Sequence, residues 1–103
     1  MNEARSTDRQ IEKVYGEDGQ LIAEAEFNSE GKLDGVERHW NLAGQQILEA
    51  SYRNGLHDGP YRSWWDTGEV KEVGQYRNGQ RVGLYTWYSA DGEKVSEHDY
   101  GGK

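Results

Sequence analysis

Residues 52–76 read YRNGLHDGPYRSWWDTGEVKEVGQY, and residues 76–100 read YRNGQRVGLYTWYSADGEKVSEHDY. Both stretches begin with Tyr-Arg-Asn-Gly, continue through Gly-x-Tyr and a further aromatic residue, reach another Gly and end on Tyr. Each of these residues has its counterpart 24 positions along the chain. A fixed period of this length is typical of proteins built from stacked structural repeats.

The period extends upstream. Gly35, Trp40 and Gly44 precede Gly59, Trp64 and Gly68 by 24 positions. A fainter copy stands 25 positions further upstream, and its extra residue falls in a turn-like segment, 28–31. The copy around Gly35 departs from the pattern, because Glu37 occupies the place of Tyr61 and Tyr85. About four repeats therefore cover residues 11–100, with a flexible segment over 1–10 and a tail over 101–103.

Each repeat is predicted to be a β-hairpin. Asn54-Gly55 and Asn78-Gly79 supply the positive φ angles that tight hairpin turns require. Because all connections are short, neighbouring strands must be antiparallel. The predicted class is all-β: a single elongated, twisted antiparallel meander. Its eight strands are expected near 11–16, 20–27, 35–41, 45–52, 59–65, 69–76, 83–89 and 93–100.

Composition limits the class of function. Only 33% of residues are hydrophobic but 12% are aromatic, which indicates a thin core made of rings. There are no cysteines and no run of apolar residues long enough to cross a membrane, so a cytoplasmic location is expected. The net charge of −7 argues against binding to nucleic acid or to anionic membranes, and it favours a basic protein partner.

The repeat resembles the bacterial variant of the MORN family. The pattern is Tyr-x-Asn-Gly-x-x-x-Gly-x-Tyr-x-x-Trp followed by Gly and an aromatic residue, seen from Tyr52 to Tyr76 and again, with Tyr88 for Trp, up to Tyr100. The resemblance implies a binding role. Bacterial relatives include antitoxin or immunity proteins that neutralise a toxin encoded beside them, and eukaryotic relatives are associated with membranes and scaffolding.

Strand alternation separates two faces on the first strand of each repeat. One face carries similar residues in every copy, such as Trp40, Trp64 and Tyr88, and is assigned to structure. The other face changes between copies and gathers large rings, which are common binding hot spots. The predicted anchors for a partner are Tyr61, Trp65, Tyr85 and Trp87. The alternative is that these rings only cover the second face of a small sheet.

The excess of acidic residues lies at the N-terminal end. Glu24, Glu26, Glu30 and Asp34 are the predicted acidic part of the binding surface, where they would steer a basic partner. The alternative is that charge on an exposed edge protects it from unwanted strand pairing, and that Glu24 and Glu26 form a solvated acidic edge.

No catalytic or metal-binding pattern stands out. His57-Asp58 and His98-Asp99 place a base beside an acid, but His57 is expected to be a surface residue of a turn. The histidines have no metal-ligand spacing, and no phosphate-binding glycine motif is present. No enzymatic activity, cofactor or metal is expected.

These observations predict a non-enzymatic antitoxin or immunity protein that blocks a basic toxin by direct binding. The alternative is a structural or membrane-associated scaffold that self-assembles through its end strands, for example as a homodimer. Only the binding character follows from the residues, whereas the toxin-blocking role follows from the family resemblance.

Overall fold

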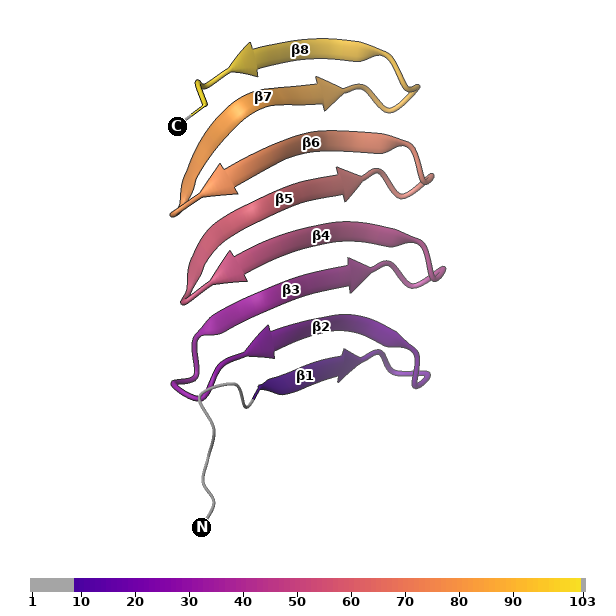
Figure 1. Ribbon diagram of the computed structural model, residues 1–103. Coiled ribbons are helices and arrows are strands. Elements are labelled where there is room, and N and C mark those ends of the chain that lie inside the picture. Colours follow the sequence, from indigo (N-terminus) through magenta and orange to yellow (C-terminus); the bar gives the residue numbers. More distant parts are fainter. Residues whose placement is uncertain (1–8, 103) are drawn as a thin grey trace.

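The computed structural model describes residues 9–102, so most of the expected flexible segment 1–10 lies outside the described part. Eight strands form one open antiparallel sheet in chain order (Figure 1), which confirms the predicted fold class. The strands are β1 (Gln10–Tyr15), β2 (Leu21–Phe27), β3 (Leu33–Trp40), β4 (Gln46–Arg53), β5 (Leu56–Trp64), β6 (Val70–Arg77), β7 (Gln80–Tyr88) and β8 (Lys94–Asp99).

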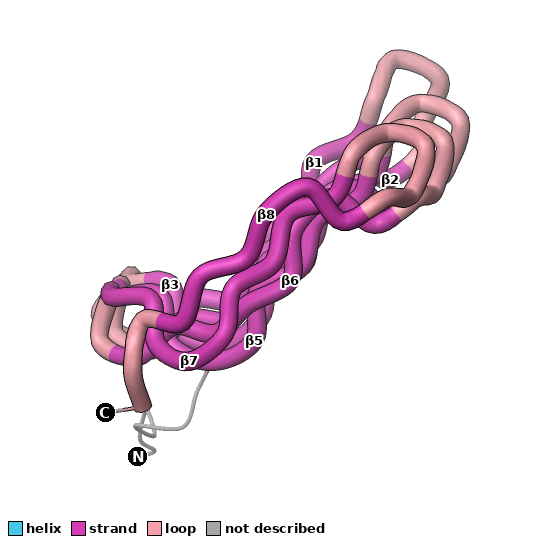
Figure 2. The backbone as a smooth tube through the Cα atoms, turned by 90° about the horizontal axis from the view of Figure 1, so that it is seen from above, coloured by secondary structure: helices cyan, strands magenta, loops and turns pink. Residues whose placement is uncertain are grey.

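The sheet is a single layer. Viewed along the stack of strands (Figure 2), the strands superimpose and the turns gather at the two ends. The molecule is only 11 Å thick along its shortest axis. Among the described residues, Ala50 and Tyr85 are the hydrophobic residues that are fully buried. With no second layer, stability must come from contacts between neighbouring strands on each face.

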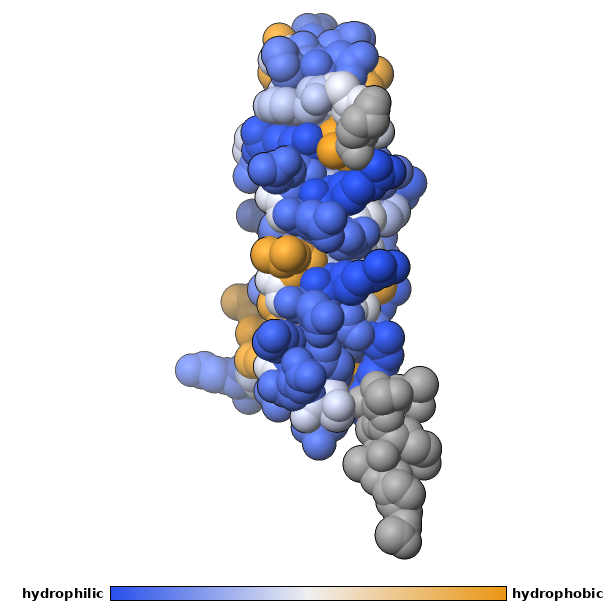
Figure 3. Space-filling model, turned by 60° about the vertical axis from the view of Figure 1, so that its left-hand side comes forward, coloured by the Kyte–Doolittle hydropathy of each residue, from blue (hydrophilic) through white to orange (hydrophobic). Residues whose placement is uncertain are grey.

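The surface reflects this construction. In Figure 3, which brings the end with the β2–β3, β4–β5 and β6–β7 turns forward, most of the visible surface is hydrophilic and hydrophobic side chains form small separate patches. The described residues contain no helix that could cross a membrane.

Asn-Gly turns join the repeats as predicted. Asn54 and Asn78 have φ near 50°, and the glycines after them are also in the left-handed region. Because the turns hold only two residues, β5 and β7 start at residues 56 and 80, three residues before the predicted starts. The expectation that Gly59 and Gly83 open these strands is therefore wrong.

Gly59 instead lies at a bulge within its strand. Between the pairs Ala50↔Tyr61 and Tyr52↔His57, one residue of β4 faces three residues of β5. Gly59 has a φ of 114°, and a Cβ atom there would lie 3.0 Å from Cβ of Ser51. The same irregularity occurs between β2 and β3 and between β6 and β7. The recurrent glycine thus lets each first strand bend.

Candidate functional site

The pairing register shows which side chains share a face, because residues opposite each other on adjacent strands point to the same side. We call one side of the sheet the aromatic face. Ala50, Tyr61 and Gly74 lie on it, because Ala50 pairs with Tyr61 and Tyr61 with Gly74 on successive strands, and so does Tyr85. We call ionic face the opposite side, which carries Glu49 and Arg62.

Tyr85 is the centre of the aromatic face. Its side chain is completely buried and lies over Gly74, where a Cβ atom would come within 2.0 Å of a Tyr85 ring carbon. Its hydroxyl donates a 2.8 Å hydrogen bond to Oε1 of Glu72. Glycine at position 74 therefore makes room for the ring, and Glu72 holds the ring's polar end.

A stacked ladder crosses the same face near the Asn-Gly turns. It consists of Tyr52, His57, Tyr76, Arg81 and Tyr100. The His57 ring stacks between Tyr52 and Tyr76, with centroids 4.4 and 4.6 Å away. The Arg81 guanidinium donates hydrogen bonds to the hydroxyls of Tyr76 (3.3 Å) and Tyr100 (3.2 Å). The recurrent tyrosines thus flank one repeat position, which is His57 in one copy and Arg81 in the next.

Arg81 also joins the ladder to Tyr85. Its guanidinium lies 4.4 Å from the Tyr85 ring centroid and 5.5 Å from that of Trp87, which are distances for cation–π attraction. The last two repeats therefore carry one connected group of rings around a fixed cation.

Burial shifts the titration of this face. It raises the pKa of Tyr85, and the bond to Glu72 acts in the same direction. Burial, with a hydrogen bond to Glu37, likewise raises the pKa of Tyr52. The hydrogen bond to Tyr76 is the largest cause that raises the pKa of Arg81. Burial lowers the pKa of His57, against a smaller opposing effect of Glu37. These shifts favour the neutral forms of Tyr52, Tyr85 and His57 and the charged form of Arg81.

Three of the four predicted ring anchors lie together. The Tyr85 ring is 6.3 Å from Tyr61 and 4.8 Å from Trp87, centroid to centroid. Trp65 lies apart from them, directly after the last residue of β5. Its Nε1 donates a hydrogen bond to the backbone oxygen of Tyr88, and Nζ of Lys71 lies 4.7 Å from the centroid of its ring. Because Tyr85 has no exposed surface, it packs this face, while Tyr61, Trp65 and Trp87 keep partly exposed surface.

The division of roles between the faces needs correction. The face with Trp40, Trp64 and Tyr88 was expected to be the structural one. The structure instead leaves Leu84 on that face 55% exposed and buries Tyr85, Ala50 and Ser63 on the aromatic face, while Thr86 is the residue that is buried on the expected structural face. The aromatic face therefore holds much of the packing as well as the exposed rings.

The prediction that His57 is a surface residue of a turn is also wrong. It lies in β5, partly buried, and its Nδ1 is buried with no hydrogen-bond partner among the described residues. The clue was the spacing: Leu33, His57 and Arg81 lie 24 residues apart, and each follows an aromatic residue across a turn. All three side chains can pack flat against a ring.

The ionic face carries a row of cross-strand partners whose charge alternates from Lys13 to Arg62. Consecutive Cα partners run across all eight strands, from Lys13 through Glu24, Arg38, Glu49, Arg62, Val73 and Thr86 to Glu97. Arg38 forms ion pairs with Glu24 (3.3 Å) and Glu49 (3.2 Å). We call this set the charge row.

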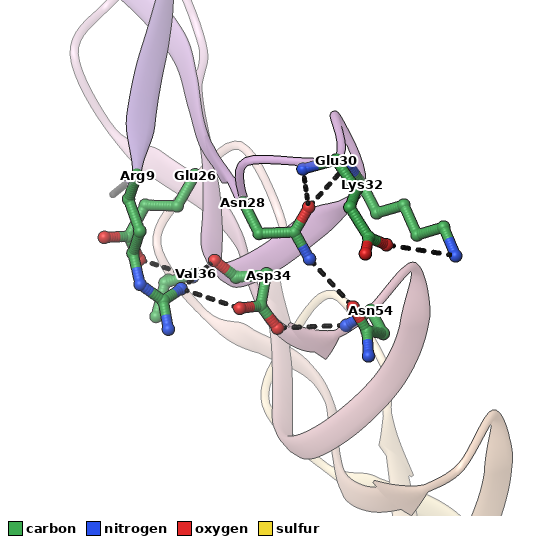
Figure 4. A network of polar contacts seen from close by, with 8 residues as sticks. All are labelled: Arg9, Glu26, Asn28, Glu30, Lys32, Asp34, Val36 and Asn54. Carbon is green, nitrogen blue, oxygen red and sulfur yellow. Dashed lines mark hydrogen bonds and ion pairs between the residues drawn. The ribbon is translucent and has the colours of Figure 1, made fainter. Parts of the chain in front are cut away.

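Figure 4 shows that most of the predicted acidic residues already have partners within the fold. Glu26 accepts a 2.9 Å hydrogen bond from the backbone N–H of Val36, and Asp34 accepts one of 2.9 Å from that of Asn54. Asp34 also pairs with Arg9 at 3.1 Å.

The remaining two predicted acids differ in their surroundings. Glu24 belongs to the charge row. Glu30 is 68% exposed and lies 3.7 Å from Lys32. The four acids therefore do not form one free acidic patch, and Glu30 is the one most open to solvent.

Within residues 9–102, no group of three or more acidic or histidine side chains is arranged to hold a metal ion. The acid–base contact of His39 is with Glu37, at 2.9 Å. His98 contacts the Tyr100 ring, with centroids 4.4 Å apart. Neither contact includes a serine or threonine hydroxyl.

The family described as MORN repeat variant matches the chain at two places, residues 11–29 and 58–78. Both matches fall on hairpins of the sheet. No curated protein and no solved structure matches the chain. MORN repeats are commonly modules that bind proteins or membranes, and the family is generally non-catalytic.

Proposed function

We propose that this chain is a non-enzymatic module that binds a basic protein toxin and neutralises it by covering part of its surface. The observation that carries the binding proposal is Trp87. Its ring remains partly exposed on the aromatic face, at a repeat position that His39 and Ser63 fill in other copies. A large ring that the repeat itself does not need is suited to a partner.

Charge supports the choice of partner. The chain has a net charge of −7, and a basic protein would associate with it faster than a neutral one would. Local pairing of Glu24, Glu26 and Asp34 does not remove this net charge. The toxin-blocking role itself rests on the resemblance to bacterial MORN-type antitoxins and immunity proteins, together with the matches to the MORN repeat variant. A cytoplasmic location belongs to the same proposal.

The test begins with capture of host proteins on the tagged chain, alongside Trp87→Ser as the matched variant. A captured basic protein is then expressed alone and together with each version. We expect it to arrest growth, wild type to relieve the arrest, and folded Trp87→Ser to bind it at least about 30-fold more weakly, as for loss of a hot spot. Equal rescue by both versions, or a captured protein that is harmless, would count against the proposal.

The proposal also excludes two other partner classes. Phosphate-rich surfaces attract basic proteins, whereas this chain is acidic. We therefore expect no binding to phosphatidylserine vesicles or to DNA at physiological salt. Co-sedimentation of the chain with such vesicles would favour a membrane role instead.

A further inference from the structure

The two outer strands differ from the six inner ones. Every residue of β1 and of β8 is exposed, whereas most residues of the inner strands are at least partly buried. Apolar side chains at both edges are open: Ile11 is 55% exposed and Val95 63%. Within residues 9–102 neither strand has a neighbour on its outer side. Such edges offer unpaired backbone groups to another strand.

The repeat defines how another strand would fit. Wherever one repeat meets the next inside the sheet, the pairing is the same: Leu48↔Ser63, Glu49↔Arg62 and Ala50↔Tyr61 between β4 and β5. The β2–β3 junction uses the corresponding residues. By the repeat spacing, β8 is equivalent to β4, and β1 is equivalent to β5. The same register would therefore pair β8 of one copy with β1 of another as Ser96↔Val14, Glu97↔Lys13 and His98↔Glu12.

That register extends the charge row from one copy into the next. The row begins with Lys13 at the β1 edge and ends with Glu97 at the β8 edge, so opposite charges meet, although Glu97 also pairs with Lys94 of its own strand at 2.7 Å. On the other face, His98 meets Glu12, so that no like charges face each other there. Opposite charges directly across from each other favour strand pairing, and like charges oppose it.

We propose that a second copy of this chain adds its β1 to β8 of the first, antiparallel and in the register of the internal repeat junctions. The contact joins two different edges, so each added copy leaves one β1 and one β8 free. Assembly is therefore open-ended and head to tail. It uses the edges and leaves the aromatic face uncovered, so it is independent of the proposed toxin binding.

Charge reversal at the junction tests the register. Mass is measured by sedimentation velocity and light scattering on the 103-residue chain, up to about 1 mM, the weak end of useful affinity. We expect the wild-type mass to increase continuously with concentration. Glu97→Lys or Lys13→Glu alone should weaken association about tenfold, because an attraction becomes a repulsion.

Two rescues make the test specific. Combining Glu97→Lys with Lys13→Glu in one chain restores opposite charges at every junction, and so does mixing the two single variants. Both should recover wild-type association. Glu69→Lys, at an exposed residue in the turn between β5 and β6, changes the net charge by the same amount as Glu97→Lys and should have no effect on association.

Three results would overturn the proposal. The first is a chain that stays monomeric throughout the concentration range, which would leave the edges to another partner. The second is a closed dimer whose mass does not grow further. The third is association that the charge reversals do not change, or that the double variant does not recover.

Discussion

Glu37 and Tyr85 occupy the same place in two repeats, yet their surroundings differ. Glu37 has Ala25 and Ala50 as its cross-strand partners and contacts His39. Tyr85 lies over Gly74. Ala50 is next to one ring, that of Tyr61, whereas Gly74 lies between the rings of Tyr61 and Tyr85. The second strand of a repeat thus carries a smaller residue, glycine in place of alanine, where the first strands on both sides carry large rings. The same backbone therefore accommodates either a polar or an aromatic residue at this position of the first strand.

The largest expected effect separates these two residues directly. Tyr85→Ala removes a fully buried ring together with its bond to Glu72, and should lower the free energy of unfolding by about 3–5 kcal/mol. Glu37→Ala removes a partly buried carboxylate that contacts His39 and should cost about 1 kcal/mol, the centre of ordinary point mutants. Urea denaturation measures both. Equal losses would mean that the aromatic copy is no more tightly packed than the polar one.

A second change breaks the match between ring and glycine. Gly74→Ala places a methyl group within the volume of the Tyr85 ring, so overpacking should cost about 1–3 kcal/mol. The same substitution in a Tyr85→Leu background should cost much less, because the ring is gone. A double-mutant cycle from denaturation curves measures this coupling. Equal costs in both backgrounds would show that Gly74 is needed for its backbone and not for its missing side chain.

The sequence revealed the repeat and the turns because those depend on local residue chemistry, such as Asn78-Gly79. It did not reveal the bulges, since a glycine such as Gly59 looks the same at a strand start as within a strand. Without the bulges the cross-strand register is unknown. The charge row, in which Glu49 lies opposite Arg62, therefore could not be predicted. The stacking of His57 was missed for the same reason, because its partners Tyr52 and Tyr76 lie on neighbouring strands.

Because His57 belongs to the stacked ladder, we expect the free energy of unfolding to depend on pH. Burial lowers the pKa of His57 below its usual 6.5, so the unfolded chain binds a proton there more readily than the folded chain. The contribution of neutral His57 to the free energy of unfolding is therefore fully present above about pH 6.5 and is lost as the pH falls below that value. His57→Leu copies Leu33 from the equivalent position upstream.

Thermal melts between pH 7.5 and 5 should therefore show a larger loss of melting temperature for wild type than for His57→Leu. His98→Leu is the matched control, because no ring stacks on both sides of His98 among the described contacts. Parallel curves for wild type and His57→Leu would show that His57 is not the group that titrates.

The smallest effect is expected on the ionic face, and its dependence on salt distinguishes it from the aromatic face. Glu49 pairs with Arg38 at 3.2 Å, and both side chains are about one-third exposed. Exposed pairs contribute about 0.2–1 kcal/mol, so Glu49→Gln should lower the free energy of unfolding by less than about 1 kcal/mol at low ionic strength. Screening at about 1 M salt should remove this loss.

Glu93→Gln, in the exposed turn between β7 and β8, is the matched control and should change little at either salt concentration. Because ring burial does not depend on charge, the cost of Tyr85→Ala should persist at high salt. If the cost of Glu49→Gln also persisted, the charge row would stabilise the sheet through packing of its side-chain stems, and the two faces would be held together by the same kind of contact.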